Sequence, residues 1–277
     1  MYDLPSRQQP LCQHAPHGVG QPASGMTGEL AKFVLAVQFL TRLPLRSDRL
    51  FTAERLAQAP RYFPLVGLLV GLASAAIFWL AALVLPVLLA VLLAVGAGLL
   101  MTGAFHEDGL ADTFDGIGGG LTRERALEIM KDSRVGTYGA AALFTALALK
   151  AGALWSMPPA WVCMALPIAH CISRFSAVCV IATSRYVRED GTGKPVAAGI
   201  SATSLMIAGF TALIAVAVGA VLFPLVSLLF GIVSFCFAHV LMRLFFEPKL
   251  GGYTGDTLGA VQQASEIGFY LGLLAWL

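Results

Sequence analysis

Residues 62–105 read YFPLVGLLVGLASAAIFWLAALVLPVLLAVLLAVGAGLLMTGAF and contain no Asp, Glu, Lys or Arg. This run is long enough for two membrane-crossing helices of about 20 residues each, and Pro86 divides it near its centre. The stretch HEDGLADTFDG follows at once, at residues 106–116, and places four acids and a histidine together. The chain therefore changes abruptly at residue 106 from a membrane-like segment to an acidic one.

The same apolar character extends over most of the chain. The 277 residues are 57% hydrophobic and only 12% charged, and their mean hydropathy is +0.78, far from the balance of a soluble domain. Further apolar segments lie at 139–157, 160–182, 196–242 (divided by Pro224) and 261–277. We therefore predict an all-α fold, a polytopic transmembrane helical bundle of about seven spans.

The charged connections indicate the orientation of this bundle. They lie at 41–61, 106–138, 183–195 and 243–256, and they alternate with uncharged proline turns. Because arginine and lysine collect on the cytoplasmic side, we expect the acidic stretch to face the cytoplasm across a bacterial inner membrane. The net charge of +2 is too small to indicate a nucleic-acid partner; the lipid bilayer is the expected one.

The N-terminal part of the chain differs from the rest. Residues 1–28 are rich in Pro, Gly, Gln and His without apolar periodicity, and we expect a disordered tail. Residues 29–43 hold too short an uncharged run to cross a bilayer, so we interpret them as an interfacial or re-entrant helix, with a full span as the alternative. Residues 29–277 then form one integral membrane domain.

The acidic stretch suggests a metal site if it is helical. At about 100° per residue, Asp108, Asp112 and Asp115 fall within roughly 60° of one another, while His106 points to the opposite side. Crowded carboxylates repel one another unless a cation lies among them, and a hard divalent cation such as Mg²⁺ takes oxygen ligands. The alternative is an acidic helix end in water, which the scarcity of charge in this chain disfavours.

Polar residues beyond this ridge could bind a phosphorylated ligand. Gly119 and Gly120 provide flexible backbone for close contact, although a plain loop would look the same. Thr122 is a plausible N-cap for a short helix that brings Lys131 and Arg134 to its last turn, where they could hold phosphate oxygens. A solvated helix with ordinary surface charges is the competing interpretation.

Two further positions are candidates. Asp256 lies in the second polar island, GGYTGDTLGA at 251–260, and could complete a metal site or orient a nucleophile; a glycine-rich turn before the last span is an equal alternative. Arg174 lies at membrane depth in the cytoplasmic half of its span, where charged residues face the bundle interior, and we expect it to face a ligand.

The chain resembles the cobalamin synthase family, the adenosylcobinamide-GDP ribazoletransferases, in several blocks that occur in the same order. These are FLTRLP at 39–44, YFPLVG at 62–67, TGAFHEDGLAD at 102–112 with the following DG and GG, EIMKDSRVGTYG at 128–139, and the 251–260 island. The resemblance covers the chain from about residue 33 to its C-terminus.

This resemblance implies a reaction and a set of partners. The cobinamide-phosphoryl group of adenosylcobinamide-GDP would pass to α-ribazole or α-ribazole 5′-phosphate, with release of GMP and with Mg²⁺ as cofactor. The metal would lie on Asp108, Asp112 and Asp115, and His106, Asp115 or Asp256 would take the proton of the attacking hydroxyl. A homo-oligomer, or an association with other late enzymes of cobalamin synthesis, is also compatible with it.

Two other classes of membrane protein are alternatives to this family. A CDP-alcohol phosphotransferase would carry an arginine where this chain has Asp112 after Ala111, so that pattern fails. A transporter would place its polar residues near the bilayer midplane, whereas these acids gather at the cytoplasmic helix ends.

Overall fold

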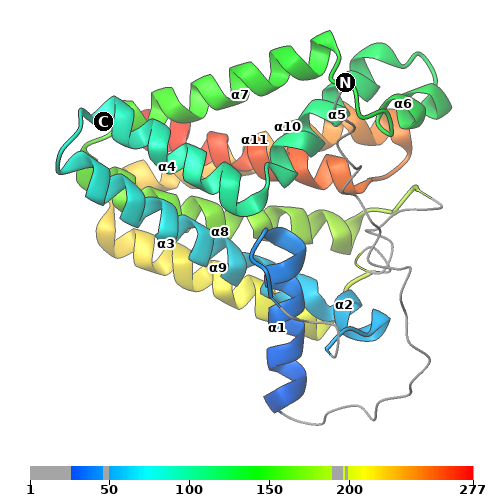
Figure 1. Cartoon of the computed structure of the whole chain (residues 1–277), viewed down its shortest axis with the longest axis horizontal. Coiled ribbons are helices and arrows are strands. Elements are labelled where there is room, and N and C mark those ends of the chain that lie inside the picture. The colour runs from blue at the N-terminus through cyan, green and yellow to red at the C-terminus, as the bar shows by residue number, and fades with distance from the viewer. Residues whose placement is uncertain (1–25, 46–49, 189–195, 197–198, 277) are drawn as a thin grey trace, which may run out of the picture.

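The computed structural model describes residues 26–45, 50–188, 196 and 199–276. Within these ranges every named element is a helix, and extended backbone pairs only in an isolated bridge between Tyr186 and Tyr253. The long helices lie side by side along the long axis of the molecule (Figure 1). The predicted all-α bundle is therefore confirmed, and the expected tail at 1–28 lies outside the described residues except for 26–28, which are helical.

The seven expected spans correspond to seven long helices. These are α3 (Phe63–Ala82), α4 (Val87–Thr102), α7 (Thr137–Ser156), α8 (Pro159–Thr183), α9 (Ala202–Leu222), α10 (Leu225–Leu250) and α11 (Gly255–Leu274). Among the described residues, five helices are long and apolar enough to cross a membrane, and α4 qualifies as a sixth only together with the acidic helix after it. Helix α11 has the length of a span but carries polar residues that it buries inside the bundle.

The proline turns lie where the sequence indicates. Pro86, Pro158 and Pro224 are the N-cap residues of α4, α8 and α10. A proline at a helix start loses no hydrogen bond, because its missing N–H would be unpaired there in any case. These turns define the end of the bundle that lacks charged connections.

Helix α8 forms the centre of the bundle, because 83% of its apolar 18-residue stretch is buried. Helices α9 and α10 bury only 22% of the corresponding stretches and present apolar surface outward. Glycines four residues apart allow close packing. A Cβ added at Gly67 or Gly71 of α3 would lie within 2.6 Å of carbonyl oxygens of α8, and Gly268 and Gly272 of α11 approach α10 in the same way.

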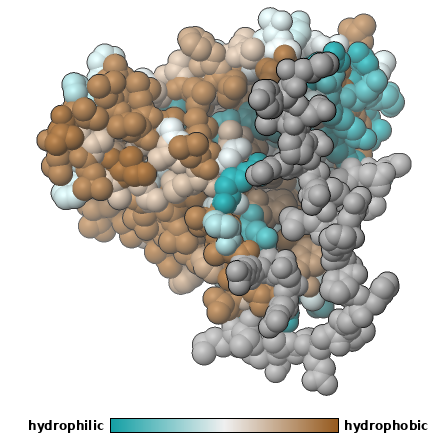
Figure 2. Space-filling model, in the orientation of Figure 1, coloured by the Kyte–Doolittle hydropathy of each residue, from teal (hydrophilic) through white to brown (hydrophobic). Residues whose placement is uncertain are grey.

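The opposite end of the bundle is polar. Helix α1 (Met26–Leu40) lies across the bundle axis there, beside the short α2 (Ala53–Gln58) and the 3-10 turn η1 (Ala59–Tyr62) (Figure 1). Hydrophilic side chains gather at this end near α6 (Arg123–Ile129), while the rest of the visible surface is mainly hydrophobic (Figure 2). The crosswise α1, 15 residues long, agrees with the interfacial helix expected at 29–43.

The acidic stretch forms helix α5 (Phe105–Gly119), which does not continue straight from α4 but bends from it by 86°. The break consists of two left-handed residues, Gly103 at φ 65° and Ala104 at φ 55°. Arg42 packs against Gly103, leaving no room for a side chain, and its backbone N–H donates to Met101 O at 2.7 Å. The bend turns α5 across the polar end of the bundle, outside the crossing helices.

Candidate active site

Two aspartates of α5 meet one aspartate of α11 at the polar end. Asp108 and Asp112 lie one helical turn apart, and Asp256 stands in the first turn of α11. The helices can approach because Gly109 has no side chain: a Cβ there would lie 2.7 Å from Asp256 O. A capping box between Thr254 and Thr257 begins α11 at this point and fixes the position of Asp256.

The three carboxylates repel one another. Burial and the negative charges of Asp256 and Asp108 raise the pKa of Asp112 to about 7. Burial also raises the pKa of Asp256, against the opposing effect of Arg188 and with a further contribution from Asp108. The cluster therefore holds more negative charge than the protein itself neutralises, as a cation-binding site would.

Asp115 is used differently from the other two members of the expected ridge. One of its carboxylate oxygens accepts the backbone N–H of Gly136 at 2.7 Å, and the other accepts that of Gly139 at 2.8 Å. Both glycines lie at the start of α7, where carboxylates pair with free N–H groups. Asp115 thus fastens α7 to α5, and the ridge predicted from helical spacing divides into a free pair and an anchored third residue.

Arg188 belongs to this site, although the sequence marks it only as one of the cations in the charged connection 183–195. Its Nη2 donates to Asp256 Oδ2 at 2.6 Å and to Met130 O at 3.2 Å, while its buried Nε has no hydrogen-bond partner among the residues that the structure describes. The backbone of Val187 and Arg185 pairs with that of Tyr253, which holds Arg188 beside α11. No local motif marks Arg188, since this pairing joins distant parts of the chain.

Two of the residues expected to bind phosphate, Lys131 and Arg134, lie beyond the end of α6. Helix α6 begins with Thr122 as its N-cap, as predicted, but ends at Ile129, so Lys131 and Arg134 are outside it. Both are exposed, and Arg134 pairs with Asp132 at 2.6 Å. Asp132 also accepts the backbone N–H of Arg134, a local bond that competes with the helix.

The two glycines pack against α6. A Cβ at Gly120 would lie 2.5 Å from the backbone N of Ala126, and one at Gly119 would touch Ile129. In this structure they allow the tight turn between α5 and α6, rather than lining the aspartate cluster.

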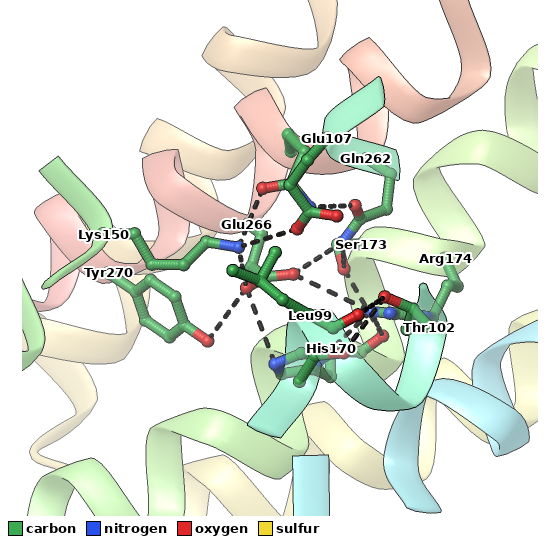
Figure 3. Close-up of polar contacts among 12 residues, drawn as sticks. Leu99, Thr102, Glu107, Lys150, His170, Ser173, Arg174, Gln262, Glu266 and Tyr270 are labelled. Carbon is green, nitrogen blue, oxygen red and sulfur yellow. Dashed lines mark hydrogen bonds and ion pairs between the residues drawn. The ribbon is translucent and has the colours of Figure 1, made fainter. Parts of the chain in front are cut away.

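Arg174 belongs to a buried polar cluster inside the bundle (Figure 3). Its Nη1 donates to His170 O at 3.1 Å and lies 3.7 Å from Glu266. Glu266 also contacts Lys150 at 3.0 Å and His170 at 3.6 Å. Arg174 was expected to face a ligand. In the structure its guanidinium forms an ion pair with Glu266 inside the bundle.

The cluster is electrically balanced. Two cations, Lys150 and Arg174, face two carboxylates, Glu266 and Glu107, and Gln263 links Lys150 to Glu107. Buried charges require such pairing because the cost of removing them from water is high. Glu107 and Glu266 are not recognisable in the sequence as partners of these cations, and the polar residues within 262–266 are the one local sign of the cluster.

His106 lies apart from the aspartates. It is 5% exposed and lines an apolar cavity between α1, α3, α5, α8 and α11. A Cβ at Gly259 of α11 would lie 2.8 Å from the His106 carbonyl oxygen, so the helices touch here. The prediction that His106 points away from the ridge agrees with this placement.

The donor set at the aspartate cluster fits Mg²⁺. Among the described residues no three His, Cys, Asp or Glu side chains converge into a complete ligand group. Mg²⁺ does not need one, since it is usually held by one or two carboxylates together with water and substrate phosphate. The neighbouring Asp108 and Asp112, with the raised pKa of Asp112, offer such a carboxylate pair.

Fold and site together define a helical integral membrane protein with an acidic, cation-suited site and a partly unpaired arginine at one polar end. Comparison with known families is more specific. The cobalamin-5-phosphate synthase family matches residues 32–274, and the chain belongs to this family.

Curated relatives carry one name. The adenosylcobinamide-GDP ribazoletransferase of Shewanella frigidimarina (strain NCIMB 400) is 45% identical over 89% of this chain and 95% of its own. That of Vibrio parahaemolyticus is 42% identical over 90% of this chain and 93% of its own. No solved structure matches the chain.

Proposed function

We propose that this protein is a transferase that moves the cobinamide-phosphoryl group of adenosylcobinamide-GDP to α-ribazole or α-ribazole 5′-phosphate. The products are GMP and adenosylcobalamin or its 5′-phosphate. The observation that carries this proposal is the match of nearly the whole chain to relatives named for this transfer. The cluster of Asp108, Asp112 and Asp256 beside Arg188 supports it, because a pyrophosphate bond is broken most readily where charge can be neutralised.

The atom balance constrains the attacking group. A ribose hydroxyl oxygen forms a bond to the phosphorus that carries cobinamide, and the bond from that phosphorus to the GMP oxygen breaks. In α-ribazole 5′-phosphate the 5′-oxygen already carries phosphate, so the nucleophile is another ribose hydroxyl. Its proton must pass to a base, and GMP leaves with the bonding electron pair.

We assign the metal-holding role to Asp108 and Asp112. When bound, Mg²⁺ would neutralise phosphate charge and act as a Lewis acid on the transferred group. Their positions on successive turns of α5 present both carboxylates toward the start of α11. Asp115 is left out of this assignment because its two oxygens hold the start of α7.

Asp256 is the proposed proton acceptor. Its raised pKa strengthens it as a base, since the efficiency of a general base improves as its pKa approaches the working pH. The contact with Arg188 orients one oxygen, and the other accepts no hydrogen bond from the residues that the structure describes. His106, which lines the apolar cavity, is the alternative proton acceptor.

Arg188 is the proposed phosphate-binding residue. Its buried Nε is a donor that no described residue accepts from, and arginine binds phosphate oxygens through several N–H groups at once. The exposed Lys131 and Arg134 lie at the same polar end and would attract the anionic substrate rather than hold its reacting phosphate.

The polar end is proposed to face the cytoplasm of the bacterial inner membrane. It carries Arg55, Arg61, Arg123, Arg125 and Arg188, while the proline turns at the other end are uncharged. This asymmetry follows the positive-inside rule. A self-association, or one with other enzymes of the same synthesis, would use the lipid-facing α9 and α10 or the polar end.

The direct test supplies membranes containing the protein with adenosylcobinamide-GDP, α-ribazole and Mg²⁺. We expect GMP and the corrinoid product to appear in equal amounts. GMP without a corrinoid product would indicate hydrolysis of the pyrophosphate instead, and the absence of both would contradict the proposed function.

A further inference from the structure

An apolar cavity lies beside the aspartate cluster. Phe39 of α1, Phe63 of α3 and Phe105 of α5 form one wall, with Phe39 stacked on Phe63 at 5.7 Å and edge-on to Phe105 at 5.6 Å. Tyr186 and Leu258 contribute further apolar surface. A fixed aromatic wall of this kind suits a flat aromatic ligand.

The cavity shares two helices with the catalytic groups. Phe105 precedes Asp108 by one turn of α5, and Leu258 follows Asp256 in the first turns of α11. A ligand in the cavity could therefore extend a polar part toward the aspartates. The apolar lining would hold the apolar part of such a ligand, and the charged residues outside the cavity would hold its polar part.

Polar groups on the wall are few. His106 and Arg174 line the cavity. Arg174 is 2% exposed, and within the described part of the chain its buried Nε has no hydrogen-bond partner. The charge of Arg174 is already balanced by Glu266 at 3.7 Å, so the cavity offers donors for a neutral acceptor rather than a site for an anion.

We propose that this cavity binds the benzimidazole base of α-ribazole, an assignment that rests on the proposed transferase function. Of the substrate parts, pyrophosphate is charged, guanine has several hydrogen-bonding edges, and cobinamide carries polar amides. Each polar group buried here without a partner would weaken binding. The benzimidazole of a riboside is a flat bicyclic ring with a single free ring nitrogen, which accepts a hydrogen bond, and it alone matches an apolar cavity with few donors.

The test fills the cavity without changing a charged residue. Ala177 of α8 lines the cavity and is 7% exposed, so the Ala177→Phe variant places a ring in the proposed base site. We expect its KM for α-ribazole to rise about 10-fold or more, since pocket changes of this size cost about 1–3 kcal/mol, while its KM for adenosylcobinamide-GDP changes less than about twofold. Ala182→Phe, at an exposed position of the same helix, is the matched control and should leave both values unchanged.

A second variant covers the case in which Ala177→Phe does not fold. Leu258→Ala enlarges the cavity, and we expect it to reduce the preference for a dimethylated benzimidazole riboside over the unmethylated one. Binding of α-ribazole alone to the detergent-solubilised protein, measured by calorimetry, should weaken in parallel with KM in both variants.

The outcomes separate the inference from the function on which it rests. A wild-type protein without transferase activity contradicts the proposed function. An active protein in which filling the cavity raises both KM values equally, or neither, overturns the base assignment alone. A lipid acyl chain found in the wild-type cavity by mass spectrometry, and displaced by Ala177→Phe without any change in α-ribazole binding, overturns it as well.

Discussion

At the scale of single residues, Asp112 has a pKa that is far above its ordinary value. Its pKa is raised from 3.8 to about 7 by burial and by neighbouring carboxylates, Asp256 first. The folded protein therefore keeps a proton that the unfolded chain has released between about pH 4 and pH 7. Because the folded state binds more protons in this window, the free energy of unfolding contributed by Asp112 falls as the pH rises through it.

This sign gives a prediction for the protein without substrate. Thermal unfolding of the solubilised protein should shift to lower temperature between about pH 5.5 and pH 8. Mg²⁺ should raise the unfolding temperature more at the higher pH, since a bound cation stabilises the folded state and protons compete with it at the lower pH. Both effects should be much smaller in Asp112→Asn.

The partly exposed Asp132, outside the aspartate cluster, supplies a control for this measurement. Asp132→Asn should keep the wild-type response to Mg²⁺. Equal pH and Mg²⁺ responses in the wild type and Asp112→Asn would contradict the role given to the cluster.

The helical spacing of the acids was visible in the sequence, but the division of labour among them was not. Asp115 lies on the same helix face as Asp108 and Asp112 by the 100° rule, yet its carboxylate is taken by Gly136 and Gly139. These two glycines follow Asp115 in the chain only after α6 and a further turn. The fold of that segment brings them back beside Asp115. For the same reason the sequence does not assign Arg188 to the site: its partner Asp256 is 68 residues away in the chain.

At the scale of helices, glycine spacing governs how closely the helices pack. Gly272 of α11 faces α10 so closely that an added Cβ would lie 2.3 Å from Phe230 O, a backbone atom that cannot move aside alone. Gly152 of α7, by contrast, has open space where a Cβ would stand.

Gly272→Ala should therefore lower the free energy of unfolding by roughly 1–3 kcal/mol, the usual cost of overpacking. Gly152→Ala should be neutral or stabilising by up to about 1 kcal/mol, because alanine favours a helix more than glycine does. Unfolding followed by circular dichroism in the same detergent compares the two. Equal effects would show that close approach at Gly272 does not hold α11 against α10.

Apolar runs and proline turns predicted most helices and the caps of α4, α8 and α10, because membrane spans depend on local composition. They did not predict the 86° bend before α5. That bend depends on Arg42, which packs against Gly103 from a distant part of the chain. The apolar segment 261–277 predicted the last span, but the sequence did not show that Gln262, Gln263 and Glu266 of α11 pair with buried side chains of other helices.

At the scale of the whole molecule, the two ends of the bundle differ in charge, and this difference predicts the topology. In a cysteine-free background, Val84→Cys lies in the uncharged turn between α3 and α4, and Leu121→Cys lies in the polar connection between α5 and α6; both positions are exposed. A membrane-impermeant maleimide should label Val84→Cys in intact spheroplasts but Leu121→Cys only after the membrane is opened. The reverse pattern would place the aspartate cluster outside the cytoplasm.

The central claim is that the aspartates at the polar end carry a Mg²⁺-dependent transfer from adenosylcobinamide-GDP to α-ribazole. The most direct measurement is the initial rate of GMP release by the purified protein in lipid vesicles, titrated with Mg²⁺, for the wild type and Asp112→Asn. The wild-type rate should rise with Mg²⁺ to saturation, and Asp112→Asn should lose at least about 100-fold at saturating substrates, as is usual when a group that stabilises transition-state charge is removed. A wild-type rate that is independent of Mg²⁺, or an undiminished rate in Asp112→Asn, would contradict the account.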